Sequence, residues 1–219
     1  DIDRTLTASQ AAARKGSHNQ CPQAHSFDHP YIKDTAYGGG GPLAFSEVGQ
    51  HIENSFCKKC WLGIISTGDA AGEGSSMRRE LYKALTHAGL KGLGPTKGDK
   101  SDWGGPWNVE TSPRPLLTSI PEGTKQDVVP HILKWYAAAG TQIADSRVFM
   151  FDDKASNVAP FAASPYNARQ VSCTTRDNDL GLCGAAPDEV VGHLGVSVCK
   201  MSFGKNVGEC KRPPCAAEL

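Results

Sequence analysis

A short apolar run at residues 148–151 ends in two adjacent carboxylates, Asp152 and Asp153. Uninterrupted apolar residues over the length of one strand are typical of a parallel strand that is buried on both faces. Two carboxylates beside such a strand cost several kcal/mol unless a cation lies near them. The sequence therefore predicts a buried strand whose carboxyl end carries a positively charged partner.

Along the rest of the chain, strand-like apolar runs alternate with segments whose apolar residues have helical spacing. A second strand-like run, residues 61–65, ends in the polar pair Ser66 and Thr67. The predicted elements are, in chain order, strands at 61–65, 147–151 and 169–172 and helices at 75–88, 124–140, 156–162 and 187–191. Strands that alternate with helices predict an α/β fold with a mainly parallel sheet, in which ligands bind at the carboxyl ends of the strands.

Helix boundaries follow from capping residues. The hydroxyl of Thr124 is expected to cap the amide of Asp127, and Gly140 marks the end of that helix. Pro130 favours a start slightly after Thr124, because proline is best tolerated in a first turn. Pro187 and the two acids after it predict the start of the last short helix.

Two stretches lack apolar periodicity. Residues 8–55 include a run of glycines at 38–41, and residues 93–121 are rich in glycine, proline and tryptophan. We interpret both as cap-like insertions in a single domain that spans residues 1–219. Residues 195–219 form a cysteine-rich tail.

Composition sets broad limits on function. The chain has 219 residues, 39% of them hydrophobic, and zero formal net charge. This length is sufficient for one sizeable core, and the balanced charge gives no reason to expect a nucleic-acid partner. The longest apolar runs are far shorter than the roughly 20 residues of a transmembrane helix. No transmembrane segment is therefore predicted.

The chain contains eight cysteines, an even number. Such a density predicts disulfides formed in an oxidising compartment, either outside the cell or in a lumen, and eight cysteines allow on the order of 100 connectivities. Cys173 and Cys183 are expected to close one loop. An alternative is Zn²⁺ held by Cys57 and Cys60 with Cys21 and one of His18, His25 or His51.

A second acidic motif lies at the other end of the sequence, where Asp1, Asp3 and Thr5 form the pattern D-x-D-x-T. An aspartate that attacks phosphorus needs a second carboxylic acid to protonate the leaving oxygen. It also needs a divalent cation, which offsets the charge that the carboxylates share with the phosphate. The two acidic motifs together predict a phosphoryl-transfer site.

With Thr67 and Lys125 between them, these motifs resemble those of the haloacid dehalogenase (HAD) superfamily of phosphohydrolases. The resemblance implies a Rossmann-like three-layer α/β sandwich. It makes Asp1 the nucleophile and Asp3 the general acid and base, with Thr5 supporting the loop. Thr67, or Ser66 as the alternative, would hold the phosphoryl group. Lys125 would neutralise it, although Lys83, Lys91, Lys97 and Lys100 compete for this role.

The resemblance also implies a Mg²⁺ site formed by Asp1, Asp152 and Asp153 with the main-chain carbonyl of Asp3. Asn157 would orient the acidic loop. The expected activity is Mg²⁺-dependent hydrolysis of a small phosphorylated substrate through an aspartyl phosphate. The alternative is a non-catalytic accessory subunit that binds a partner protein in a larger extracellular or luminal assembly.

In this family an apolar central strand leads into the first motif. An apolar run of about five residues is therefore expected directly before Asp1 in the native polypeptide, because a missing central strand leaves ladder groups unpaired.

Overall fold

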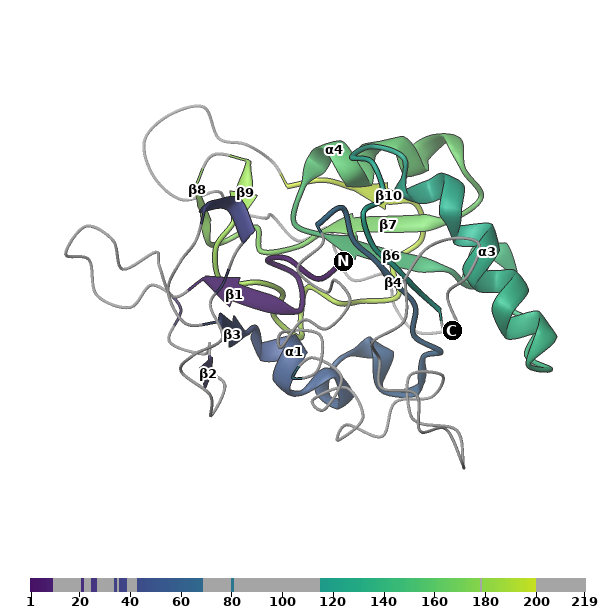
Figure 1. Ribbon diagram of the computed structural model, residues 1–219, viewed down its shortest axis with the longest axis horizontal. Helices are drawn as coiled ribbons and strands as arrows, with labels where there is room; N and C mark the ends of the chain where they lie inside the picture. Colours follow the sequence, from purple (N-terminus) through teal and green to yellow (C-terminus); the bar gives the residue numbers. More distant parts are fainter. Residues whose placement is uncertain are drawn as a thin grey trace.

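The structure is a computed structural model, and it describes residues 1–9, 21, 25–26, 34, 36–38, 43–68, 80, 115–177 and 179–199. The fold is mixed α/β and contains small parallel sheets (Figure 1). This arrangement confirms the α/β class that the alternation of strands and helices predicts.

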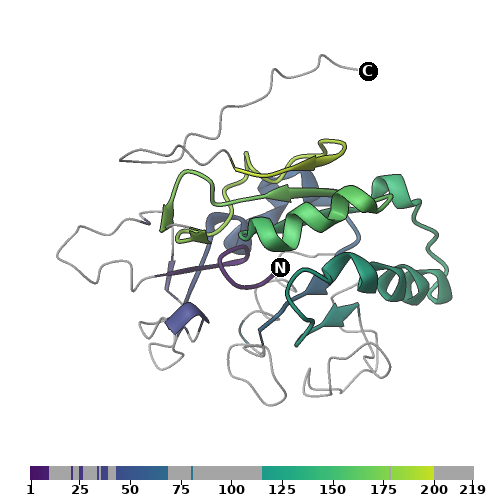
Figure 2. The same ribbon diagram turned by 90° about the horizontal axis from the view of Figure 1, so that it is seen from above.

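Two of the sheets are parallel. Strands β6 (Phe149–Asp152), β7 (Asn167–Gln170) and β10 (Val196–Ser197) pair in the order β10-β7-β6. Strands β4 (Ile64–Ile65) and β5 (Leu116–Leu117) form the other parallel pair. The first residues of the chain lie between β6 and the β4-β5 pair (Figure 2). There the backbone nitrogen of Asp1 donates to the carbonyl of Phe151 at 2.9 Å.

The remaining strands are antiparallel. Strands β1 (Thr7–Ser9) and β2 (His25–Ser26) flank β3 (Leu43–Phe45), and β8 (Arg176–Asp177) pairs with β9 (Leu180–Gly181). The helices are α1 (Glu47–Gln50), α3 (Lys125–Ala138) and α4 (Ala155–Val158). Short 3₁₀ helices occupy Ala36–Gly38, Ile52–Asn54, Phe56–Lys59, Asp145–Arg147 and Ala159–Ala163.

Helix α3 buries Val129, Ile132 and Tyr136, which share one face at helical spacing. It begins at Lys125 although Pro130 lies inside it. The predicted cap by the Thr124 hydroxyl is wrong: this hydroxyl donates to the carbonyl of Pro121, and the amide of Asp127 donates to the carbonyl of Thr124. The helix is therefore fixed by its buried face rather than by a side-chain cap.

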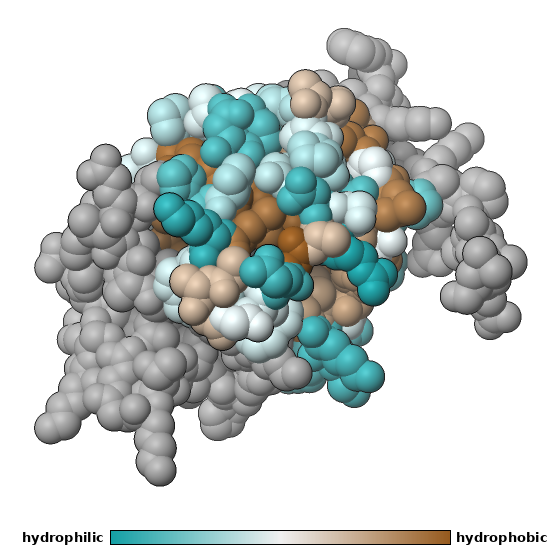
Figure 3. Space-filling view, turned by 90° about the vertical axis from the view of Figure 1, so that its right-hand side faces the viewer, coloured by the Kyte–Doolittle hydropathy of each residue, from teal (hydrophilic) through white to brown (hydrophobic). Residues whose placement is uncertain are grey.

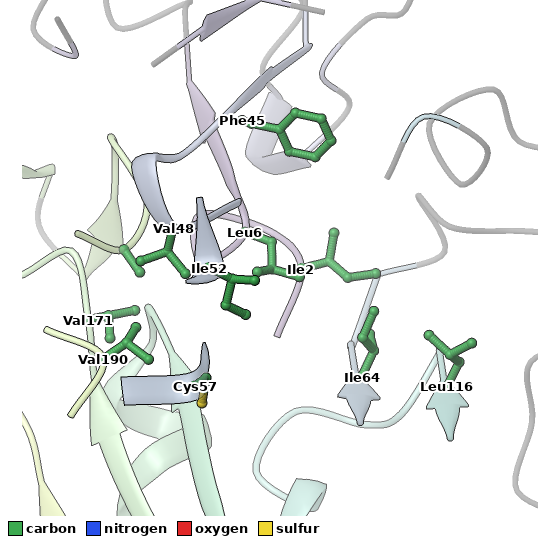
Figure 4. Packing of buried hydrophobic residues seen from close by; sticks show 11 residues of the cluster. Ile2, Leu6, Phe45, Val48, Ile52, Cys57, Ile64, Leu116, Val171 and Val190 are labelled. Carbon is green, nitrogen blue, oxygen red and sulfur yellow. The ribbon is translucent and has the colours of Figure 1, made fainter. Parts of the chain in front are cut away.

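Within the described ranges, the buried apolar residues form two clusters. One joins the first motif to β3, β4, β5 and α1, and Figure 4 shows Ile2 and Leu6 there beside Ile64. The other lies among α3, α4, β4, β5, β6 and β7, with Phe161 and Val158 fully buried. Each cluster holds a side chain of β4 and one of β5, so the β4-β5 pair connects the two.

The surface is mixed in character. On the side where α3 lies, polar and apolar residues are interspersed (Figure 3). In the part of the chain that the structure describes, no helix is long and apolar enough to cross a membrane.

Two segments differ from their predictions. The expected irregular insertion at 8–55 contains β3 and α1, and Leu43 and Val48 are part of the buried interior. Residues 187–191 do not form the predicted helix, and residues 187–189 form a turn instead. The carboxylate of Glu189 accepts the amide of Ala186 nearby and the amides of Ser172 and Cys173 from a distant part of the chain, and the two long-range bonds favour this non-helical conformation. Except for Glu80, the predicted helix at 75–88 lies outside the described residues, and so does the insertion at 93–121 up to residue 114.

The structure has disulfides between Cys21 and Cys183 and between Cys173 and Cys199. The predicted Cys173–Cys183 bridge is therefore wrong. Strand β10 pairs with β7, and the amide of Cys199 donates to Gln170, which brings Cys199 beside Cys173. The alternative zinc site is wrong in its use of Cys21, because Cys21 is in a disulfide. Cys57 and Cys60 are free thiols.

We expect loss of the Cys21–Cys183 bridge to lower the free energy of unfolding by about 2–5 kcal/mol, because it closes a long loop with a sequence separation of 162. The variant Cys21→Ser with Cys183→Ser tests this by urea denaturation, and Cys60→Ser is the control for thiol removal. A non-reducing peptide map that joins Cys173 to Cys183 would contradict the assignment.

Candidate functional site

A cavity of about 240 Å³ lies where distant parts of the chain meet. Its walls come from the first motif, the 3₁₀ helix at 36–38, the end of β4, the start of α3 and the loop after β6. The lining residues are Asp1, Asp3, Ala36, Tyr37, Thr67, Gly68, Glu122, Lys125, Lys154 and Asn157. The structure thus brings together five of the predicted site residues at one edge of the parallel strands.

The first motif is a tight turn around one carbonyl group. The carbonyl of Ile2 accepts the amides of Leu6 and Thr7, both at 3.0 Å, and the hydroxyl of Thr7. The side chains of Ile2 and Leu6 are buried in the core (Figure 4). Because Ile2 is anchored in this way, Asp1 and Asp3 project from a fixed backbone on either side of it.

Lys125 connects two of the acidic residues. Its ammonium group donates to Asp1 Oδ1 at 2.7 Å and to Asp152 Oδ2 at 2.5 Å. The lysine side chain is only 1% exposed. A buried ammonium requires such partners, because removal from water is costly for an isolated charge. Of the lysines considered for this role, Lys125 is the one that the structure describes.

Asp152 is held by further donors. Its Oδ1 accepts the amide of Lys154 at 2.9 Å and the side-chain amide of Asn157 at 3.2 Å. Asn157 in turn accepts the amide of Gly123 at 3.0 Å. Asn157 therefore links the acidic loop after β6 to the turn before α3.

Asp153 is also fully buried. Its Oδ2 accepts the amide of Gly181 at 3.0 Å, and its Oδ1 accepts the hydroxyl of Tyr37 at 3.2 Å. Burial, followed by the charge of Asp152, raises the pKa of the Asp153 carboxyl to about 7. The excess of negative charge at this point favours either a proton or a cation.

Three carboxylates have the arrangement of a metal site. Asp1, Asp152 and Asp153 each offer one oxygen, and these oxygens lie within 4.8 Å of one another. Oxygen ligands are those that hard divalent cations prefer. The donor set therefore fits a divalent cation. The side chain of Asp3 is not part of this set, and the resemblance to the HAD superfamily implies a metal contact for its carbonyl rather than for its carboxylate.

Asp3 has a different environment. Its Oδ1 is buried without a hydrogen-bond partner among the residues that the structure describes. Burial raises the pKa of the Asp3 carboxyl, which favours its protonated form. A buried carboxylic acid that faces a cavity is suited to donate a proton.

The hydroxyl residues separate into exposed and buried ones. Thr67 follows β4, is exposed and lines the cavity, whereas Ser66 is 2% exposed and does not. The side chain of Thr5 is buried beneath the motif, and its carbonyl accepts the amide of Ala185 and the hydroxyl of Ser46. Thr67 is thus the hydroxyl available to a ligand.

Three further residues line the cavity that were not predicted from the sequence: Tyr37, Glu122 and Lys154. Glu122 accepts hydrogen bonds from Lys154 at 3.2 Å and from Ser156 at 2.5 Å, and these donors lower the pKa of its carboxyl. Lys154 follows the acidic pair directly, so its position beside the site could have been predicted. Tyr37 comes from a glycine-rich stretch without periodicity and gave no signal.

No protein-family model, curated protein or solved structure matches the chain.

We expect Lys125→Met to lower the free energy of unfolding by about 3–5 kcal/mol, because it leaves the buried carboxylates of Asp1 and Asp152 without their cation. Lys134→Met is the matched control, since Lys134 is exposed on the same helix. Urea denaturation measures both. Equal effects of the two substitutions would contradict the structural role of Lys125.

We expect Mg²⁺ or Mn²⁺ to stabilise the protein more strongly as the pH rises through about 7. The folded-state pKa of Asp153 is raised, so without a cation its contribution to stability is present at low pH and is lost as the pH rises through this value. A cation replaces the proton, and below pH 7 its affinity should fall up to about tenfold per pH unit. Melting temperatures with and without cation at pH 6 and pH 8 test this, and equal shifts at both pH values would contradict it.

Proposed function

We propose that this chain is a HAD-like phosphomonoesterase that requires Mg²⁺ and forms an aspartyl phosphate on Asp1. The observation that carries the proposal is the buried Lys125, which joins Asp1 to Asp152 at the cavity. The two small parallel sheets on either side of Asp1 support a HAD-like three-layer sandwich (Figure 2). The two disulfides support a secreted or luminal location.

In this mechanism the phosphoryl group enters the cavity between Asp1 and Thr67. Thr67 and Lys125 donate hydrogen bonds to its oxygens, and the lysine charge offsets the negative charge that develops there. A carboxylate oxygen of Asp1 forms a bond to phosphorus while the bond to the leaving oxygen breaks. Asp3, whose protonated form is favoured by burial, gives its proton to that leaving oxygen.

The second half of the reaction reverses the role of Asp3. Its carboxylate now accepts a proton from water, the water oxygen forms a bond to phosphorus, and the bond to Asp1 breaks to release phosphate. Asp1, Asp152 and Asp153 would hold Mg²⁺, which lowers the repulsion between these carboxylates and the phosphoryl oxygens. The cavity volume of about 240 Å³ favours a small phosphorylated substrate.

We expect Asp3→Asn to lower turnover of a generic aryl phosphate by roughly 10²- to 10⁴-fold, because the amide cannot transfer the proton. Asp145→Asn is the control, since Asp145 is exposed and away from the cavity. Mg²⁺ with beryllium fluoride should trap a phosphate mimic on Asp1, which intact-protein NMR can detect.

Activity of Asp3→Asn equal to that of the unmodified protein would overturn the mechanism. Absence of turnover and of the beryllium fluoride adduct in the unmodified protein would favour the accessory-subunit alternative.

A further inference from the structure

Tyr37 is an aromatic residue at the cavity that neither acidic motif predicts. It lies in the short 3₁₀ helix Ala36–Gly38, and 41% of it is exposed. It forms part of the cavity wall together with Asp3 and Lys154. A large side chain in the wall of a cavity can contact a bound ligand and also the residues that bind this ligand.

The Tyr37 side chain contacts charged groups on several sides. Its hydroxyl donates to Asp153 Oδ1 at 3.2 Å. The guanidinium of Arg4 lies 5.7 Å from the ring centroid, and the ammonium of Lys154 lies 5.0 Å from it. Both distances are within the range of cation–π attraction. The ring is therefore held beside the two cationic residues that adjoin the acidic motifs.

The backbone at Tyr37 is held by the first motif itself. Arg4, the residue between Asp3 and Thr5, forms an ion pair with Asp34 at 2.7 Å, and both side chains are buried. Arg4 also donates to the carbonyl of Ala36 at 3.2 Å, and Asp34 accepts the amide of Ala36 at 3.0 Å. Tyr37 has a left-handed backbone with φ of 52°. Such a conformation of a bulky residue persists where its surroundings fix it, and this occurs mostly at functional sites.

The bond to Tyr37 completes the support of Asp153. The amide of Gly181 holds Oδ2, and the hydroxyl of Tyr37 holds Oδ1, so the carboxylate is held from both sides. Each carboxylate oxygen has a second lone pair that remains available to a cation. Burial and the nearby carboxylates raise the pKa of the Tyr37 hydroxyl, so it remains a donor.

We propose that Tyr37 is a positioning residue for the divalent cation: its hydroxyl orients the Asp153 carboxylate as a ligand, and its ring forms the wall against which the substrate binds. The proposal rests on the proposed function. It connects the first motif to the cation site through Arg4, Asp34 and Tyr37. Partners of this kind typically change metal affinity by roughly 10- to 100-fold when they are removed.

The test is the affinity for Mn²⁺, measured by calorimetry and by electron paramagnetic resonance without substrate. We expect Tyr37→Phe to weaken Mn²⁺ binding by about tenfold, because it removes only the hydroxyl. Tyr136→Phe is the matched control: its hydroxyl donates to the carbonyl of Leu62, and it does not line the cavity. This control should alter stability and leave Mn²⁺ affinity unchanged.

A second variant separates the ring from the hydroxyl. At saturating Mg²⁺, Tyr37→Leu should raise the KM for an aryl phosphate severalfold more than Tyr37→Phe does, because only the leucine variant lacks the ring. Mn²⁺ affinity of Tyr37→Phe equal to that of the unmodified protein would overturn the positioning role while the proposed function stands. Failure of the unmodified protein to bind Mn²⁺ would overturn both. Circular dichroism establishes that each variant is folded.

Discussion

The ammonium group of Lys125 holds three distant parts of the chain together. It lies between Asp1 and Asp152, and very little of any of the three charged side chains is exposed to water. A buried charge without a partner costs so much that the first motif, the start of α3 and the end of β6 must meet at this point. One ammonium cannot balance all the carboxylates, however, because Asp153 is buried beside Asp152. The remaining negative charge is what makes the site attractive to a cation.

Apolar packing makes this arrangement of charges rigid. Ile2 lies between the two aspartates of the first motif and packs in one core cluster, while α3 packs in the other. The first motif and the lysine are thus fixed by separate groups of buried residues that meet at the β4-β5 pair. Any shift of Asp1 relative to Lys125 would require repacking of close-packed side chains. When charge develops in such a site, the free-energy cost of reorienting its groups is small, because they are already held in place.

The sequence predicts those parts of the structure that depend on neighbouring residues. It does not predict the parts that depend on contacts between distant residues. The strand at 147–151 is marked by its apolar run and the helix that begins at Lys125 by its helical spacing. Both elements and the acidic pair could therefore be predicted. Residues 187–191 carry an equally good local signal, yet the Glu189 carboxylate bonds to the amides of Ser172 and Cys173 and the helix does not form. The partner of Cys173 depends likewise on the pairing of β10 with β7. Tyr37 reaches the site through Arg4 and Asp34, which no local pattern indicates.

The hydrogen bonds divide the carboxylates of the site into two kinds. Asp152 and Asp153 accept donors on both of their oxygens, from backbone amides and from Lys125, Asn157 and Tyr37. At Asp153 the donors oppose the rise in pKa that burial causes, and at both residues they fix the orientation of the carboxylate, which suits a cation ligand. Asp3 has a buried oxygen without a donor in the described part of the chain, and burial favours its neutral form. In the proposed reaction Asp3 releases and regains a proton, and the absence of such donors suits this role, because they would hold the carboxyl in one charge state. The same short loop can therefore present Asp1 next to a cation site and Asp3 as an acid.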